Sequence, residues 1–179
     1  VKGKRGNPKP DQTFYEQMNS TTTYFEIKKN ATYDFLLKKL EPVFKDYLKS
    51  PFTVVNLNAR MTKPNPQLVH DSDGQPRGAE ILHVDGYPPG HFKCMIYPKP
   101  LTRAYGQIKI DGQIFESKKP GLAVLFNPDL PHHSTCGTSE MRYAIEITLM
   151  RTLVEVDILK HYPSTPDSTY FYQPYQAYF

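Results

Sequence analysis

The chain has 179 residues, of which 39% are hydrophobic and 22% are charged, and its net charge is +4. This length suits one domain with a single core. No apolar run reaches the roughly 18 residues of a membrane-spanning helix, so we expect no membrane contact. The mild charge argues against a nucleic-acid partner. Two cysteines, Cys94 and Cys136, are too few for a disulfide scaffold and predict reduced thiols in a cytoplasmic protein.

Composition divides the chain into three parts. Residues 1–10, rich in Lys, Gly and Pro, are expected to be a flexible basic segment. Residues 11–162 are expected to form a single domain, with a first candidate strand at 21–27. Residues 163–179 form a Pro/Tyr-rich tail that either packs on the domain or is disordered.

The strongest helix prediction covers residues 32–49. Its apolar side chains follow the i, i+3, i+4, i+7 spacing of one helix face, which predicts packing against a core. Thr32 is the expected N-cap. Pro42 lacks a backbone donor and is expected to kink or split the helix.

From residue 52 onward the pattern changes to short strands. Asp111-Gly112 between two of them predicts a tight hairpin. Eight short strands after one helix predict a β-sandwich or barrel. The expected strands are 52–59, 79–84, 91–97, 106–110, 113–116, 121–126, 132–136 and 141–150.

A candidate metal site begins with His83 and Asp85. These residues are two apart at the end of a predicted strand, so their side chains would point to the same face. A third ligand must come from elsewhere, and His132 and His133 are the candidates. Two histidines and one carboxylate leave three metal positions open, which suits non-haem ferrous iron.

Arg142 begins a strand whose side chains alternate between an apolar and a polar face. It would point into the barrel, where an unpaired guanidinium is costly. A bound carboxylate would offset that cost through a two-pronged contact. The alternative is a structural salt bridge to Glu146 or Asp129.

From His83 to Leu149 the sequence resembles the iron(II)/2-oxoglutarate-dependent dioxygenases, in particular their prolyl-hydroxylase-like members. The shared pattern is H-x-D, a distal histidine and a basic residue about ten positions later, here Arg142. Two flanking segments, Tyr105–Ile110 and Lys119–Pro128, also resemble the family. The resemblance implies a mainly β, double-stranded β-helix (jelly-roll) barrel with one or more N-terminal supporting helices.

The same resemblance assigns roles to individual residues. His83, Asp85 and His132 would hold the catalytic iron, with His133 as the alternative distal ligand. A strand cannot point both histidines inward. Cosubstrate binding would involve three further residues: Arg142 on the distal (C5) carboxylate of 2-oxoglutarate, Tyr97 as its second partner, and Asn58 lining the pocket. Ala144 stands where relatives often carry Ser or Thr, so that contact is expected to be absent.

The resemblance implies an oxidoreductase that uses iron(II), 2-oxoglutarate and O2, with ascorbate as a further candidate cofactor. Oxidative decarboxylation of 2-oxoglutarate would drive hydroxylation of an amino acid, a protein side chain or another small molecule. The loops at 60–79 and 86–90 are expected to shape the substrate entrance. Two alternatives stay open: a cupin-type metal enzyme without 2-oxoglutarate, and a non-catalytic binding barrel. The sequence does not specify an oligomeric state.

Overall fold

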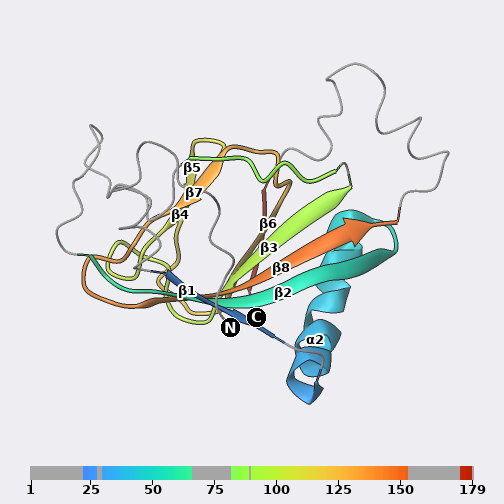
Figure 1. Ribbon diagram of the computed structural model, residues 1–179, viewed down its shortest axis with the longest axis horizontal. Coiled ribbons are helices and arrows are strands. Elements are labelled where there is room, and N and C mark those ends of the chain that lie inside the picture. Colours follow the sequence, from blue (N-terminus) through green and yellow to red (C-terminus); the bar gives the residue numbers. More distant parts are fainter. Residues whose placement is uncertain (1–21, 28–29, 66–81, 89, 153–173, 179) are drawn as a thin grey trace, which may run out of the picture.

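The computed structural model describes residues 22–27, 30–65, 82–88, 90–152 and 174–178. Within these ranges the fold consists of one helix and a set of antiparallel strands (Figure 1). The helix is α2 (Ala31–Leu48), and the strands are β1 (Thr22–Glu26), β2 (Phe52–Thr62), β3 (His91–Tyr97), β4 (Ile108–Ile110), β5 (Gln113–Phe115), β6 (Leu122–Phe126), β7 (His132–Ser134), β8 (Arg142–Arg151) and β9 (Tyr175–Tyr178).

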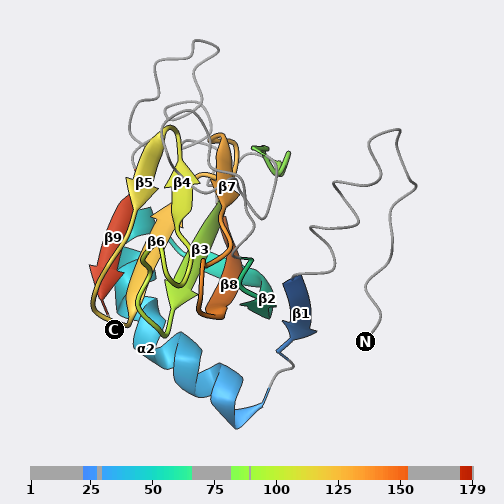
Figure 2. The same cartoon turned by 90° about the vertical axis from the view of Figure 1, so that its left-hand side faces the viewer.

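These strands form two sheets with the interior of the molecule between them. The large sheet has the order β1-β2-β8-β3-β6-β9, and the small sheet has the order β5-β4-β7. The helix α2 covers the face of the large sheet that is turned away from the small sheet (Figures 1 and 2). Neighbours such as β2 and β8 are distant in sequence. This arrangement is a jelly roll, so the predicted mainly β fold class is confirmed.

Alternation along β3 sends its side chains into two separate cores. Phe92, Cys94 and Ile96 pack in the outer core, beneath α2. Met95 and Tyr97 pack in the inner core, together with residues of the small sheet. Because successive side chains on a strand point to opposite faces, one central strand can serve both cores.

The predicted alternation of β8 is also present. Ile147 and Leu149 are fully buried in the outer core, whereas Tyr143 on the same face is 38% exposed. The inward face contains the polar side chains and is buried as well. Its members are Arg142, Ala144, Glu146 and Thr148. Charged groups therefore lie inside the molecule, where they need partners.

The helix differs from the prediction at its start. Asn30, not Thr32, is the N-cap, and its side chain accepts a hydrogen bond from the Tyr33 backbone N–H at 3.0 Å. Pro42 was expected to kink or split the helix, and the helix continues through it without a split. Packing of flanking residues such as Leu40 and Phe44 in the outer core compensates for the missing backbone hydrogen bond.

The small sheet contains the hairpin predicted at Asp111-Gly112. Both residues have positive φ, 48° and 78°, as a tight two-residue hairpin turn requires. Glycine adopts this conformation without steric cost, and aspartate tolerates it better than most residues. The turn fixes the register of β4 against β5, with Ile110 opposite Gln113.

Two further predictions need correction or completion. Of the strand expected at 79–84, the described part is irregular, and His83 forms an isolated bridge to His132. The segment is held by that bridge and by nearby loops. In the tail, residues 175–178 form β9 and extend the large sheet beside β6. Residues 1–10, 66–79, 163–173 and 179 lie outside the described residues.

Cys94 and Cys136 are both free and buried, in agreement with the prediction of reduced thiols. Burial raises the pKa of the Cys94 thiol well above its usual value, so this side chain is inert packing. Among the described residues, no helix combines the length and apolar character that crossing a bilayer requires.

Candidate metal centre

His83 and Asp85 lie on an irregular segment that runs beside β7. The His83 N–H donates to the His132 carbonyl at 3.0 Å, and the His132 N–H donates to the His83 carbonyl at 2.8 Å. The Asp85 N–H donates to the Pro128 carbonyl at 3.0 Å. These backbone bonds, rather than the predicted strand, bring both side chains to the same place.

His132 reaches the same place from β7. Its side chain is buried, and its Nδ1 lies 2.7 Å from the Leu130 carbonyl. A carbonyl only accepts, so Nδ1 must carry the proton, which leaves a lone pair on Nε2. Nε2 is buried and has no hydrogen-bond partner among the described residues. A backbone bond of this kind typically orients a histidine that binds a metal through its other nitrogen.

His133 points to the other face of β7. It lies opposite Lys109 on β4, whereas His132 lies opposite the buried Ile110. His133 borders a small cavity beside His132, but it supplies no atom to the group of candidate ligands formed by His83, Asp85 and His132. The geometry therefore favours His132 over His133 as the distal ligand.

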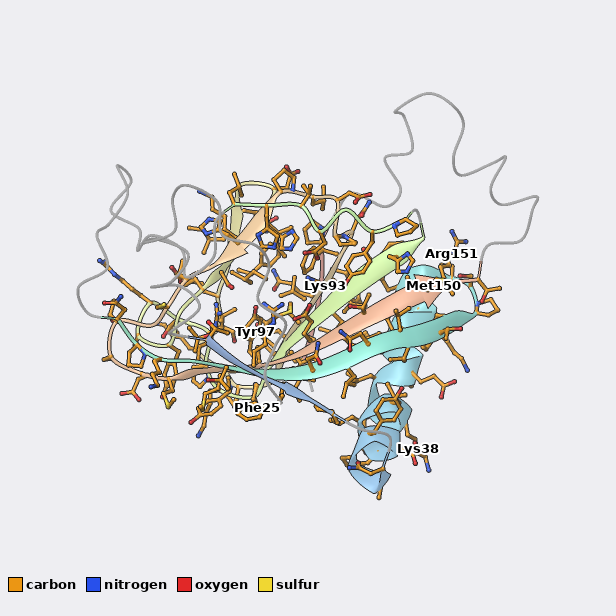
Figure 3. The ribbon with its side chains drawn as sticks, viewed as in Figure 1. Phe25, Lys38, Lys93, Tyr97, Met150 and Arg151 are labelled. Atoms are coloured by element: carbon orange, nitrogen blue, oxygen red, sulfur yellow. The ribbon has the colours of Figure 1, made fainter. Side chains whose placement is uncertain are left out.

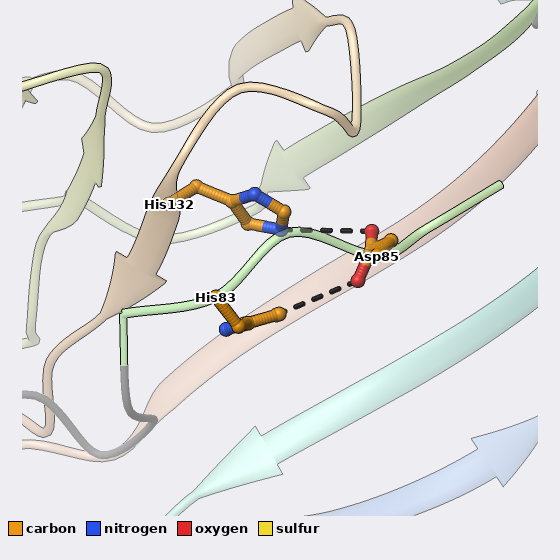
Figure 4. A group of neighbouring side chains, drawn as sticks. All are labelled: His83, Asp85 and His132. Carbon is orange, nitrogen blue, oxygen red and sulfur yellow. Dashed lines mark ion pairs between the residues drawn. The ribbon is translucent and has the colours of Figure 1, made fainter.

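His83, Asp85 and His132 form a cluster whose candidate ligand atoms all lie within 4.8 Å of one another (Figure 4). The His83 Nε2 is 3.4 Å from Asp85 Oδ1, and the His132 Nε2 is 3.5 Å from Asp85 Oδ2. Ligands at right angles, each about 2.1 Å from a metal, are about 3 Å apart. The two histidine–carboxylate distances are near this value, which is compatible with binding at one face of an octahedral metal ion.

The structure adds a buried ion-pair network that the sequence did not predict. Lys93 on β3 forms ion pairs with Asp85 and, at 3.1 Å, with Glu146 on β8. Glu146 also pairs with Arg60 on β2. Their side chains are at most 14% exposed. The pairing depends on the register of three strands, which no local motif specifies.

This network influences the charge of Asp85. Burial would by itself raise the pKa of the carboxyl group. The neighbouring His132 and His83 imidazoles, together with the Lys93 ammonium, outweigh burial and hold the pKa of Asp85 well below its usual range. Asp85 is therefore ionised, which is the form that binds a metal.

Arg142 is buried at the start of β8, at 2% exposure. Its Nη1 donates to the Thr135 carbonyl at 2.9 Å and its Nη2 to the Thr62 hydroxyl at 3.1 Å. Its Nε has no hydrogen-bond partner within the ranges that the structure describes. In the described part of the chain Arg142 forms no ion pair with a carboxylate, so the alternative salt bridge to Glu146 or Asp129 is not formed. Neutral acceptors leave its charge uncompensated.

Tyr97 and Asn58 both lie on inward-facing positions of the large sheet. Tyr97 is 1% exposed and belongs to the inner core (Figure 3). Asn58 lies opposite Glu146 in the register of β2 and β8. Both can reach the interior, but neither belongs to the three-residue cluster.

A small cavity adjoins the cluster. Its volume is about 10 Å³, which is room for about one water molecule. Ser134 of β7 and Phe126 of β6, whose ring contacts His132 edge-on, help to close it. The remaining lining residues are Arg60, His83, Lys93, Met95, Ile108, His132 and His133.

No protein-family model matches the chain, and no curated protein matches it by sequence. Solved structures do match its fold. EvdMO1 aligns at a TM-score of 0.57 and 16% identity, over 74% of this chain and 36% of its own, so the chain spans about a third of EvdMO1. HygX from Streptomyces hygroscopicus, with nickel, 2-oxoglutarate and hygromycin B bound, aligns at a TM-score of 0.50 and 12% identity. The alignment covers 79% of this chain and 78% of HygX. These likenesses confirm the jelly-roll fold.

Proposed function

We propose that this protein is an iron(II)- and 2-oxoglutarate-dependent oxygenase that hydroxylates an organic substrate. The observation that carries the proposal is the cluster of His83, Asp85 and His132 inside a jelly roll. Two nitrogens and one carboxylate oxygen are the ligand set of non-haem iron oxygenases, because they leave three coordination positions open. The structurally similar HygX was crystallised with 2-oxoglutarate and, separately, with iron.

In this proposal the iron ligands are His83, Asp85 and His132. The Leu130 carbonyl orients His132 so that Nε2 faces the metal. Lys93 and the Pro128 carbonyl hold Asp85. Bound iron would activate O2, so that 2-oxoglutarate, O2 and a C–H bond give succinate, carbon dioxide and an alcohol.

Arg142 is the proposed receptor for the distal carboxylate of 2-oxoglutarate. Its buried charge is held by two neutral oxygens, from Thr135 and Thr62, and no other described residue satisfies Nε. A carboxylate would supply the missing charge and acceptor. Thr62 of β2, which lies opposite Arg142 in the register of β2 and β8, also supplies a hydroxyl beside the guanidinium. Relatives often carry a hydroxyl at the position of Ala144 instead. Tyr97 and Asn58 are proposed to line the remainder of the cosubstrate pocket.

One anaerobic experiment tests the reaction class. The protein is mixed with ferrous iron and then with 2-oxoglutarate, and the visible spectrum is recorded. We expect a weak charge-transfer band from the chelate. Iron binding without this band would favour a cupin-type metal enzyme, and no iron binding would favour a non-catalytic barrel. Succinate release during a screen of amino acids, peptides and other small molecules then identifies the substrate class.

Replacing Arg142 with alanine tests the cosubstrate site. We expect the affinity for 2-oxoglutarate to fall by about 10- to 100-fold, because a charge-assisted contact contributes about 1.5–3 kcal/mol, while iron affinity stays unchanged. Arg151→Ala is the matched control. Arg151 is also buried on β8, but it lies at the opposite end and bonds Ser50. Equal 2-oxoglutarate affinity in both variants would remove Arg142 from the site.

A further inference from the structure

Lys93 places a positive charge directly beside the candidate metal ligands. It lies on β3, near the middle of the large sheet, and its side chain is 5% exposed (Figure 3). Its ammonium pairs with the Asp85 Oδ2 and lies 3.1 Å from the Glu146 Oε1. These two carboxylates from different segments fix the ammonium in place, so it cannot swing into solvent without breaking both ion pairs.

The position of this charge has opposite effects on the two kinds of ligand that a metal centre takes. A divalent cation bound to an Asp85 oxygen at about 2 Å would lie only about 5 Å from the Lys93 ammonium. In a poorly solvated interior, like charges at that separation repel appreciably. The same ammonium attracts an anionic oxygen ligand bound to the metal. Lys93 should therefore weaken the binding of a bare cation and strengthen the binding of an anion.

The other inward-facing charges do not cancel this effect. Arg60 and Arg142 are positive, whereas Asp85 and Glu146 are negative. Together with Lys93 the formal charges are three positive and two negative, which leaves one positive charge on these described residues. A divalent metal raises that excess to three, and a dianion such as 2-oxoglutarate returns it to one. An anionic ligand is thus matched to the site and a neutral ligand is not.

We propose that Lys93 is a specificity-determining residue that disfavours the bare divalent cation and favours an anionic oxygen ligand at the open metal positions. The inference rests on the proposed function and adds a residue to it. A purely structural role for Lys93, holding Asp85 in position, predicts a different outcome, because its loss would weaken metal and anion binding together.

The test compares Lys93→Met with the wild type by titration calorimetry without oxygen. Ni²⁺ is titrated into the metal-free protein, and 2-oxoglutarate is then titrated into the Ni²⁺-loaded protein. We expect the variant to bind Ni²⁺ about tenfold more tightly and 2-oxoglutarate about tenfold more weakly. Methionine retains most of the lysine stem, so the packing of β3 changes little.

Three further variants sharpen the comparison. Lys93→Arg keeps the charge and should restore both affinities to near the wild-type values. Lys109→Met is the control. Lys109 of β4 lies opposite His133, on the face of the small sheet that His132 does not share, so its loss should change neither affinity. Glu146→Gln removes a negative charge from the network, and should weaken Ni²⁺ binding and strengthen 2-oxoglutarate binding. This last variant keeps the test valid if Lys93→Met does not fold.

Opposite shifts in the two affinities support the proposal. If Lys93→Met loses affinity for both ligands, or changes neither, the proposal is overturned. Failure of the proposed function gives a different result, since the wild-type Ni²⁺ form would then bind no 2-oxoglutarate at all. The Ni²⁺ affinities would still decide whether Lys93 repels the metal, and equal values in the wild type and Lys93→Met would overturn that part independently.

Discussion

At the scale of single residues, the choice between His132 and His133 depends on strand parity. Adjacent residues on β7 cannot share a face, and the register opposite Ile110 turns His132 inward. The contact with the Leu130 carbonyl then fixes which ring nitrogen is available. Sequence alone predicts that one histidine faces inward, but the register needed to choose between them is a property of the folded sheet.

Separate alanine substitutions of the two histidines test this assignment. His132→Ala should lower Ni²⁺ affinity by more than about 100-fold, which is the upper end for residues that merely support a ligand. His133→Ala should change it by less than about threefold, because its ring supplies no atom to the cluster. Titration calorimetry measures both, and circular dichroism checks that each variant is folded. The reverse order of affinities would make His133 the ligand.

The candidate site was predictable in part. His83, Asp85 and a distal histidine follow from motif spacing and family resemblance, although the segment that carries His83 and Asp85 is irregular rather than a strand. Lys93 was not predicted as part of the site. In the sequence it is one lysine within an apolar strand, and its contact with Asp85 depends on how a loop crosses the sheet. Contacts between distant segments leave no local pattern.

At the scale of elements, predictions succeeded where a periodic pattern specifies burial. The strand at 91–97 has the predicted bounds, and the apolar stripe of α2 packs on the large sheet. A prediction failed where a side-chain hydrogen bond, rather than the apolar spacing, decides where a helix begins. At the start of α2 the Asn30 side chain caps the helix, two residues before the predicted N-cap Thr32. The helix also continues through Pro42, where packing in the outer core supports it. Tertiary contacts decide such cases.

The contact between α2 and the sheet gives a prediction for alkaline solution. Tyr47 packs edge-on against Phe92 of β3 and also contacts Tyr175 of β9. Its hydroxyl is buried without a hydrogen-bond partner in the described part of the chain, and burial raises the pKa of Tyr47 to about 12. Because the unfolded chain releases this proton near pH 10, the stabilising effect of the neutral phenol is lost as pH rises from about 10 to 12.

Tyr47→Phe should remove that part of the pH dependence. Relative to pH 8, the wild type should lose about 1 kcal/mol more unfolding free energy at pH 11 than the variant does. Urea unfolding at both pH values measures the difference, with Tyr143→Phe as a control for an exposed tyrosine. Identical losses in the wild type and Tyr47→Phe would show that the Tyr47 hydroxyl is not buried in solution.

At the scale of the whole molecule, the candidate site joins parts of the chain that the sequence keeps far apart. His83 and Asp85 precede β3, His132 lies on β7, and Arg142 begins β8. Closure of the jelly roll brings them together, with β8 paired between β2 and β3. The predicted number and order of strands indicated a barrel or sandwich. The position of β9 beside β6 was not predictable, because a short Tyr-rich segment has no partner-specific pattern.

Such a site should couple ligand binding to global stability, because only the folded chain assembles it. Ni²⁺ at about 100 times its dissociation constant should add about 2.7 kcal/mol, which for a domain of this size raises the melting temperature by about 5–10 °C. Adding 2-oxoglutarate should raise it further in the wild type and much less in Arg142→Ala. Differential scanning calorimetry measures these shifts. His132→Ala should show almost no Ni²⁺ shift, and a shift equal to that of the wild type would mean that the metal binds elsewhere on the molecule.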